Sequence, residues 1–467
     1  MSDWREMKTL LFSLTETEAK HRQIYEQIRN RIENGQLVED SQLPSIRQLA
    51  DLLEVSRNTT LQAYEQLAAE GYIRSEPKRG YYVQKFIPIY LKQEAHKQTV
   101  QELAEEKYSI DFRTGIIDQT AFPLNRWRQC ANKVLNEDMI YGYGEPFGDK
   151  FLREQLAEYL MRSRGVFTTS EAIIIGSSTQ SLLMQLSILL KEDYKSLAVE
   201  EPGYDGASYV FELQGFTIEP VKISPIGISL DELAKARSRL LYLTPSHQFP
   251  TGATIPIPER QQLIKWAKEH QAYIIEDDYD SEFMYQHQPV PALSSFDSEG
   301  RVIYISTFSK AFLPAIRISY MILPPSLIEV YKKKMFQLEQ SASMLHQRAL
   351  ARFMKEGYWD SHLRKMRARY KAKMAALIET LRQTFDERLN IIGQQAGLYI
   401  IVQVNTNLDE TTLIQKAKDY SVKVYSTKPY FKGPYPDKPL FQLGFANLSI
   451  EQIIEGVTKL SKAWHEL

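Results

Sequence analysis

Short apolar runs alternate with longer helical segments over most of this chain, from about residue 108 onward. The runs are rich in β-branched residues and are expected to form buried strands at 172–176, 196–199, 240–243, 273–276, 302–305 and 318–323. Because helical segments separate these strands, the sheet should be mostly parallel and covered by helices on both faces. In such a sheet, ligands bind beyond the carboxyl ends of the strands.

A lysine follows the strand predicted at 302–305. Lys310 lies in otherwise apolar surroundings, Thr307 precedes it, and Arg317 comes seven residues later. Desolvation lowers the pKa of such a lysine, so its neutral amine can form a Schiff base with an aldehyde. The hydroxyls and Arg317 can hold a phosphate on that aldehyde. The natural candidate is pyridoxal 5′-phosphate (PLP), although a surface lysine after a strand would show the same local pattern.

Other strand ends carry groups that suit the same cofactor. A turn of small hydroxyl residues separates the strand 172–176 from an apolar helix, which is typical of an anion site. The turn contains Ser177, Ser178 and Thr179. After the strand 273–276, Asp277 and Tyr279 lie on one face, where they can bind a pyridine nitrogen and a phenolic oxygen. Tyr204 can stack on a planar ring. The alternatives are loop packing for Tyr204 and a solvated acidic turn, which would account for Asp278 and Asp280.

The first 85 residues have a different pattern. Ile24, Ile28 and Ile32 recur at helical spacing, Ser45 begins a second helix, and Ser56 is a good N-cap for a third. Two short strands then flank the basic turn 77–80. This order predicts a helix-turn-helix followed by a β-hairpin wing, whose third helix enters the DNA major groove. A small helical interaction domain is the alternative.

Specific side chains follow from that docking geometry. Arg57 is placed to pair with guanine, whereas Thr59, Thr60, Lys78 and Arg79 are placed to hold phosphates. Residues 1–85 contain 12 lysines and arginines and 13 aspartates and glutamates, so the positive charge of this module must be local to one face.

Composition narrows the class of protein further. The chain has 467 residues and a single cysteine, so an internal disulfide is excluded and a reducing cytoplasm is expected. No cluster of cysteines and histidines indicates a metal site. The N-terminus has no signal pattern, and no apolar run is long enough to span a bilayer.

Residues 23–83 resemble the winged helix-turn-helix of the GntR family, through the elements LPS-x-R, VSR-x-T and EGY…GYYV. Residues from about 111 to 467 resemble fold-type-I, class-I aminotransferases. The order of the two modules is similar to MocR/GabR-type regulators, as are the elements PSHQFPTG, EDDYDSEF and TFSKAFLPAIRISY. With the resemblance, the expected DNA-binding residues are Ser45, Arg47, Ser56, Arg57, Thr59, Thr60, Lys78, Arg79 and Gly80.

The same resemblance assigns roles around PLP. Lys310 would carry the cofactor, and the phenol of Tyr143 would reach the phosphate from the partner subunit of a homodimer. The full expected cofactor-binding set is Lys310, Asp277, Tyr279, Tyr204, Ser177, Ser178, Thr179, Thr307, Arg317 and Tyr143. The chain departs from the pattern at two carboxylate clamps. Gln442 stands where aminotransferases usually carry an arginine, and Gly206 stands where GABA-responsive members carry one.

The sequence therefore predicts a multidomain protein: a winged helix-turn-helix at 15–84, a linker at 85–107, and an α/β fold-type-I PLP-dependent aminotransferase-like domain at 108–467. The linker alternatively forms a helix packed on the second domain. The expected function is a cytoplasmic transcriptional regulator that binds a DNA operator and senses PLP, an amine or a related metabolite. Lys428 or His247 could also recognise an effector. An active aminotransferase with an added DNA module and a regulator that binds no cofactor are the alternatives.

Overall fold

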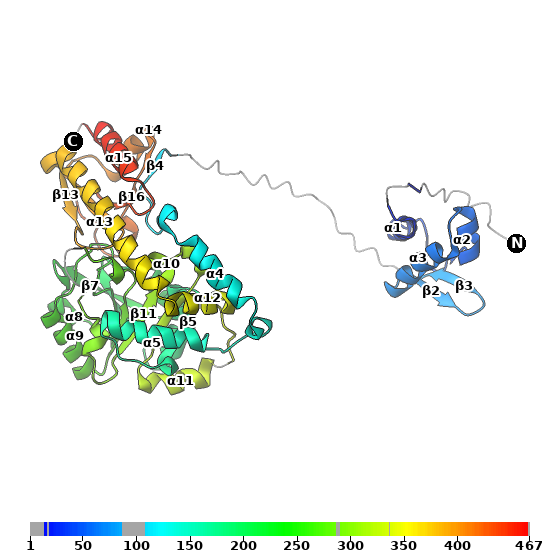
Figure 1. Cartoon of the computed structure of the whole chain (residues 1–467), viewed down its shortest axis with the longest axis horizontal. Helices are drawn as coiled ribbons and strands as arrows, with labels where there is room; N and C mark the ends of the chain where they lie inside the picture. Colours follow the sequence, from blue (N-terminus) through cyan, green and yellow to red (C-terminus); the bar gives the residue numbers. More distant parts are fainter. Residues whose placement is uncertain (1–13, 16–17, 86–107, 286–289, 336, 466–467) are drawn as a thin grey trace. The chain divides into compact units, whose positions relative to one another are not determined.

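The computed structural model describes residues 14–15, 18–85, 108–285, 290–335 and 337–465. The chain divides into two compact units, residues 1–105 and 106–467 (Figure 1). The predicted linker lies outside the described residues except for Lys85 at its start. In the described residues no helix is both long and apolar enough to cross a membrane.

The first unit is a winged helix-turn-helix, as the sequence predicted. Its elements are α1 (Lys20–Glu33), β1 (Gln42–Leu43), α2 (Ile46–Leu52), α3 (Arg57–Ala69), β2 (Ile73–Glu76) and β3 (Gly80–Val83). The three strands form a sheet in the order β1-β3-β2. Strand β1 was not predicted from the sequence. Ser45 and Gln48 form a reciprocal capping box at α2, and Ser56 caps α3 by accepting from the Thr59 backbone N–H. The hydroxyl of buried Tyr64 donates to Pro44 O at 2.9 Å, which joins α3 to the turn before α2.

The second unit is built on an eight-stranded sheet, ordered β5-β12-β11-β10-β9-β6-β7-β8. The strands are β5 (Ile173–Gly176), β6 (Ser196–Glu201), β7 (Thr217–Ser224), β8 (Gly227–Ile228), β9 (Leu240–Leu243), β10 (Tyr273–Asp277), β11 (Val302–Thr307) and β12 (Ser319–Ile322). The central strands are parallel, whereas β12 runs antiparallel to both of its neighbours. Strands β7 and β8 were not predicted. Pro220 interrupts the β pattern of β7, and β8 has only two residues.

Helices cover both faces of this sheet. They are α4 (Leu124–Val134), α5 (Lys150–Arg164), α6 (Thr179–Leu190), α7 (Asp205–Leu213), α8 (Leu230–Leu233), α9 (Ile257–Glu269), α10 (Phe308–Ala311), α11 (Pro325–Met335), α12 (Met344–Lys355) and α13 (Tyr358–Phe385). Successive strand residues point to opposite faces. Thus Ile275 of β10 packs in the core with α6 and α7, whereas Ile274 packs in the core with α9.

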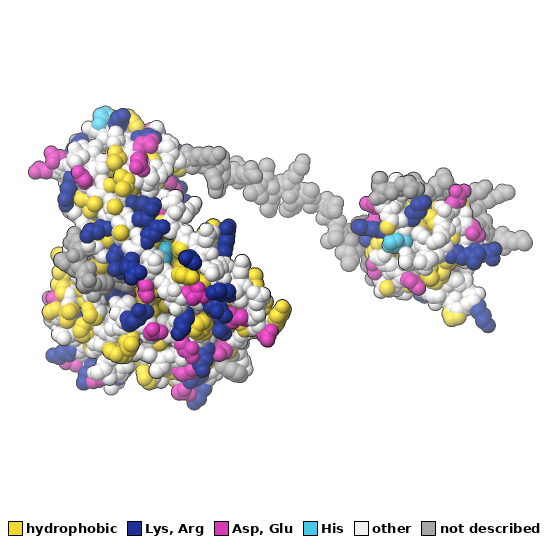
Figure 2. All heavy atoms as spheres, viewed as in Figure 1, with side chains coloured by type: hydrophobic (Ala, Val, Ile, Leu, Met, Phe, Trp, Pro, Cys, Tyr) yellow, Lys and Arg dark blue, Asp and Glu magenta, His cyan; other side chains and the backbone are white. Residues whose placement is uncertain are grey.

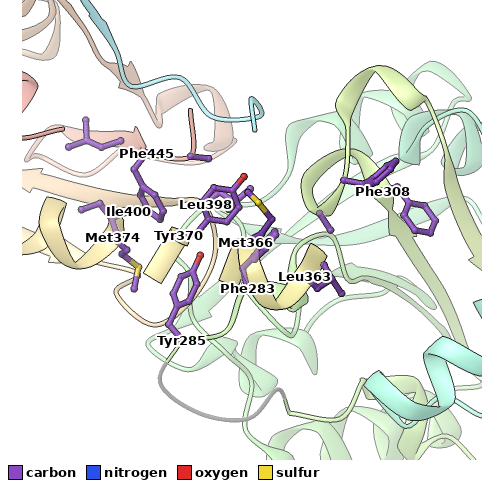
Figure 3. Packing of buried hydrophobic residues seen from close by; sticks show 14 of the residues in the cluster. Phe283, Tyr285, Phe308, Leu363, Met366, Tyr370, Met374, Leu398, Ile400 and Phe445 are labelled. Atoms are coloured by element: carbon purple, nitrogen blue, oxygen red, sulfur yellow. The ribbon is translucent and has the colours of Figure 1, made fainter. Parts of the chain in front are cut away.

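The C-terminal part forms a smaller sheet, ordered β13-β14-β17-β16. The remaining elements of the second unit are β4 (Ile110–Asp111), β13 (Leu389–Ile392), β14 (Tyr399–Val404), α14 (Glu410–Asp419), β15 (Val422–Lys423), β16 (Tyr425–Ser426), β17 (Leu440–Gly444) and α15 (Ile450–Ala463). Strands β4 and β15 form a separate two-stranded sheet. The long helix α13 belongs to the same core as both sheets. Figure 3 shows Met366 and Tyr370 of this helix beside Phe283 and Leu398.

Candidate functional site: a pocket at the carboxyl ends of the strands

A pocket of about 290 Å³ opens where the strands of the large sheet end. Eight of the ten predicted cofactor-binding residues line it: Ser178, Thr179, Tyr204, Asp277, Tyr279, Thr307, Lys310 and Arg317. They come from segments that are far apart in the sequence. The fold therefore brings these side chains together at the carboxyl edge of the sheet, as parallel strands require.

Lys310 is enclosed on α10, directly after β11. Burial lowers the pKa of its ammonium group, although the nearby carboxylates of Asp280 and Asp277 oppose that shift. Gly115 lies against the lysine, because a Cβ at that position would be 3.4 Å from Lys310 Nζ. A lysine with a lowered pKa has more of the neutral amine that attacks a carbonyl carbon.

Asp277 ends β10 and is buried. The hydroxyl of Tyr242 donates to its Oδ2 at 2.6 Å, whereas its Oδ1 has no hydrogen-bond partner. Burial raises the pKa of this carboxyl to about 7. A buried acceptor without a partner is costly unless a ligand supplies a donor. A protonated pyridine nitrogen is such a donor.

Tyr279 lies on the same side as Asp277. Its hydroxyl is 3.0 Å from His247 Nδ1 and 3.2 Å from Tyr399 OH. Burial raises the pKa of Tyr279 well above the ordinary value, so the phenol keeps its proton and can donate to a cofactor oxygen. Tyr204 is partly buried in the pocket wall and meets the Phe249 ring at a centroid distance of 6.0 Å.

The phosphate end of the pocket combines a helix N-terminus with a cation. Ser178 caps the twelve-residue helix α6, whose first-turn N–H groups have no acceptor within the helix. Arg317 carries positive charge at the pocket and makes no ion pair with a described residue. It holds a left-handed backbone conformation, with φ 53° and ψ 55°, which costs about 1–3 kcal/mol in a residue other than glycine. Such strain is typical of functional positions.

Two predicted residues do not line the pocket. Ser177 donates its backbone N–H to Ser341 Oγ at 3.2 Å, and its hydroxyl is 3.3 Å from Ser181 Oγ. Tyr143 is 87% exposed on the loop after α4, and Tyr141 is equally exposed. The pocket also includes residues that the sequence analysis missed: Thr114, Gly115, Gln180, Tyr242, Thr244, Phe249, Asp280, Ser309, Leu398 and Tyr399.

The acidic turn after β10 is not solvated. Asp278 is buried and its Oδ2 accepts from Arg164 Nε at 2.7 Å, and Asp280 is buried against His247 Nδ1 at 2.9 Å. The alternative interpretation of these two carboxylates is therefore wrong. It failed because their partners lie more than 30 residues away in the sequence, so no local signal indicates the pairing.

Uncharged residues, Gln442 and Gly206, occupy the two positions at which a carboxylate-binding arginine is missing. Gln442 is buried in β17, with its Oε1 at 3.4 Å from Thr114 Oγ1 and its Nε2 without a partner. Gly206 lies so close to Tyr204 that a Cβ would be 2.4 Å from the tyrosine ring. An arginine there would displace Tyr204. Among the described residues that line the pocket, only Lys310 and Arg317 are basic, since His247 and Lys428 do not line it.

In the first unit, most predicted DNA-binding residues lie on the surface. The side chains of Arg47 and Arg79 are 73% and 77% exposed, and Arg57 is exposed at the start of α3. Lys78 is exposed at the tip of the wing in a left-handed conformation, and Gly80, two residues later, has a φ of 115°.

The remaining positions of that set lie in and beside the helix starts. Ser45 and Ser56 are exposed N-caps, and Thr59 is partly buried with its hydroxyl 2.7 Å from Ser56 Oγ. The expectation for Thr60 is corrected, because its side chain is fully buried on the inward side of α3. It lies one residue beyond Thr59, which turns it by about 100° towards the core.

Comparisons with known proteins agree with this architecture. The family described as "Aminotransferase class I and II" matches residues 62–460, and "Bacterial regulatory proteins, gntR family" matches residues 20–83. Among solved structures, a kynurenine aminotransferase from Pyrococcus horikoshii shares the fold with a TM-score of 0.70 at 22% identity, covering 81% of this chain and 97% of that chain. The α-aminoadipate aminotransferase LysN from Thermus thermophilus has a TM-score of 0.68 at 26% identity, covering 79% and 95% of the two chains.

The pair of modules defines an HTH-type transcriptional regulator with an aminotransferase-like domain. The chain is 38% identical to the uncharacterized HTH-type regulator YdeL of Bacillus subtilis, over 95% of this chain and 96% of that protein. It is 32% identical to the probable rhizopine catabolism regulatory protein MocR of Rhizobium meliloti, over 95% and 93% of the two chains. This chain belongs to the MocR/GabR-type subfamily of GntR transcriptional regulators.

Proposed function

We propose that this regulator binds PLP covalently through Lys310 and uses occupancy of the pocket to control its affinity for DNA. The observation that carries the proposal is the complementary set of groups in one pocket. Lys310 offers an amine of lowered pKa, Asp277 offers an acceptor without a partner, and Arg317 offers an unpaired cation. When bound, PLP would supply an electrophilic carbon and an electron-withdrawing ring.

Each remaining residue has one task in holding the cofactor. Asp277 would accept a hydrogen bond from the protonated pyridine nitrogen, Tyr279 would donate to the phenolic oxygen, and Tyr204 would cover one face of the ring. The phosphate would meet Ser178, Thr179, Thr307, Arg317 and, less directly, Ser177. Tyr143 would complete the phosphate site of the partner subunit in a homodimer. Its side chain is 87% exposed in the single chain and is therefore accessible to a partner.

DNA binding is proposed for the exposed residues of the winged unit. Arg57 would read a guanine edge at the start of α3, and Arg47 would hold the backbone beside it. The wing residues Lys78, Arg79 and Gly80 would contact phosphates. Ser45, Ser56 and Thr59 would place the helix starts against the DNA backbone. The regulator would act in the cytoplasm, and a dimer would present two such units to two half-sites.

The effector is proposed to be PLP itself or an amine without an α-carboxylate. Gln442 and Gly206 leave both carboxylate-clamp positions without an arginine, and desolvating an unpaired carboxylate is unfavourable. Transamination of common amino acids should therefore be negligible, because the substrate is not held in a reactive orientation. The name of a relative supports PLP: the pyridoxine biosynthesis regulator PdxR of Corynebacterium glutamicum is 27% identical, over 84% of this chain and 86% of that protein.

The proposal is tested by selecting an operator from a random duplex library with the PLP-loaded protein. Its affinity is then measured for the PLP-loaded protein, the PLP-free protein, and the loaded protein with a panel of amines and amino acids. Operator affinity should change with PLP or with an amine. An operator affinity that is the same with and without PLP, and with every amine and amino acid tested, would refute the sensing role. Rapid conversion of PLP to pyridoxamine phosphate by an ordinary amino acid would favour a working aminotransferase instead.

A further inference from the structure

The middle of α13 is rich in basic residues, most of which lie on its outer side. Between residues 361 and 378 the sequence has six lysines and arginines and no aspartate or glutamate. The inner side of the helix packs into the hydrophobic core through Leu363, Met366, Tyr370 and Met374 (Figure 3). The basic residues are Arg364, Lys365, Arg367, Arg369, Lys371 and Lys373.

Three of these cations have partners within the fold. Lys373 Nζ and Arg369 Nε donate to Asp118 Oδ2 at 2.8 and 3.1 Å, and Arg367 Nε donates to Glu282 O at 2.9 Å. Arg364, Lys365 and Lys371 are exposed and make no ion pair with any residue that the structure describes. These three residues are called the α13 basic face. On the side seen in Figure 2, lysine and arginine side chains gather over this helix.

The spacing of the α13 basic face suits a long polyanion. Arg364 and Lys371 are two helical turns apart, which is about 10 Å along the axis, and Lys365 lies next to them. The exposed positions between and after them include Ala368 and Ala372, so neither bulk nor negative charge keeps a ligand away. Duplex DNA carries one charge per about 1.7 Å of its axis, so a face of this length meets several phosphates.

DNA is the polyanion that this chain brings near. Residues 86–107 tether the winged unit to the second unit, so DNA bound by the winged unit is held at high effective concentration. Ser109, near the start of the second unit, lies beside α15, where Lys459 Nζ donates to Ser109 Oγ at 2.9 Å. Helix α15 itself packs on α13. Ser109 is therefore separated from α13 by one helix.

We infer that the α13 basic face binds the sugar-phosphate backbone of DNA, in addition to the contacts proposed for the winged unit. The aminotransferase-like domain is then a second, sequence-independent DNA-binding surface. Phosphate contacts of this kind add affinity and salt dependence without reading bases. The inference does not depend on which effector enters the pocket, and its test leaves the winged unit unchanged.

The test compares the full-length protein with the variant R364Q/K365Q/K371Q on one long duplex of random sequence, over a series of salt concentrations. Each lost phosphate contact should reduce the slope of log affinity against log salt by about 0.9, so a reduction of about 2 to 3 is expected. The ratio of operator to random affinity, each measured on duplexes of equal length, should not change. Glutamine keeps helix propensity close to that of lysine and arginine.

The matched control is K222Q/R237Q/K333Q, which removes three exposed cations, one each from β7, the loop before β9 and α11. The control should keep the wild-type slope. Equal losses in both triple variants would show that only net charge matters, and an unchanged slope in the α13 variant would assign the face to another partner; either result overturns the inference. If the triple variant does not fold, R364Q and K371Q are measured singly, each with an expected slope reduction of about 0.9.

Discussion

Replacing Asp277 by asparagine should stabilise the cofactor-free protein at neutral pH while weakening PLP binding. The carboxyl is buried, and its pKa is raised from 3.8 to about 7. Between these two values the unfolded chain has already released the proton that the folded chain still holds. Each pH unit in that range therefore costs the folded wild type about 1.4 kcal/mol. Asparagine does not ionise, and its Oδ1 can still accept from Tyr242.

The magnitude follows from the same arithmetic. From about pH 5.5 to about pH 7, the wild type should lose about 1.5 kcal/mol of unfolding free energy relative to Asp277→Asn, slightly less than the full slope because the folded carboxyl begins to ionise near pH 7. Other buried carboxyls titrate in both proteins, so their contributions cancel in the difference. Urea unfolding of the PLP-free proteins across this range measures it, with exposed Asp193→Asn as the control. A difference that does not vary with pH would refute the assignment of the raised pKa to Asp277.

The PLP-bound state should show the opposite preference. The charge-assisted hydrogen bond from the pyridine nitrogen is lost in Asp277→Asn, which should weaken PLP binding by about 1.5–3 kcal/mol, or roughly tenfold to a hundredfold. Equilibrium titration with PLP followed by absorbance measures this loss. Equal PLP affinity in the two proteins would place the pyridine nitrogen elsewhere.

The remaining predictions concern three other regions. Arg57→Ala should reduce the preference for operator over random duplex by about 1–3 kcal/mol, whereas Arg79→Ala should weaken both alike; fluorescence anisotropy at fixed salt distinguishes them. Asp118→Ala should destabilise the second unit by about 3 kcal/mol in chemical denaturation, because it leaves Lys373 buried without its anion. Gln442→Arg should let α-carboxylate amino acids bind, seen as a change in the visible spectrum, and an equal response in the wild type would show that the missing arginine is not limiting.

Local features of the fold were predictable from the sequence, whereas features set by distant partners were not. The capping box of Ser45 and the N-cap of Ser56 depend on residues three positions away, so the sequence shows them directly. Thr60 was misplaced because one residue of helical phase separates an exposed side chain from a buried one.

The candidate site shows the same division. Lys310 and Asp277 stand at the ends of recognisable strands, so their meeting in one pocket could be predicted from the sheet alone. Tyr242, which donates to Asp277, lies 35 residues earlier in the sequence and inside a strand, and nothing in its surroundings separates it from a core tyrosine. Asp278 was open to interpretation as solvated because its partner Arg164 is contributed by α5, which is distant in the sequence.

The central claim is that PLP is held by Lys310, and reduction with borohydride tests it most directly. The full-length protein is incubated with PLP, reduced, digested and examined by peptide mass spectrometry, with Lys310→Ala as the control. We predict that the phosphopyridoxyl group is found on the peptide containing Lys310 and is lost in the variant. A wild-type protein that carries no such group, or carries it on another lysine to the same extent in both proteins, would contradict the account.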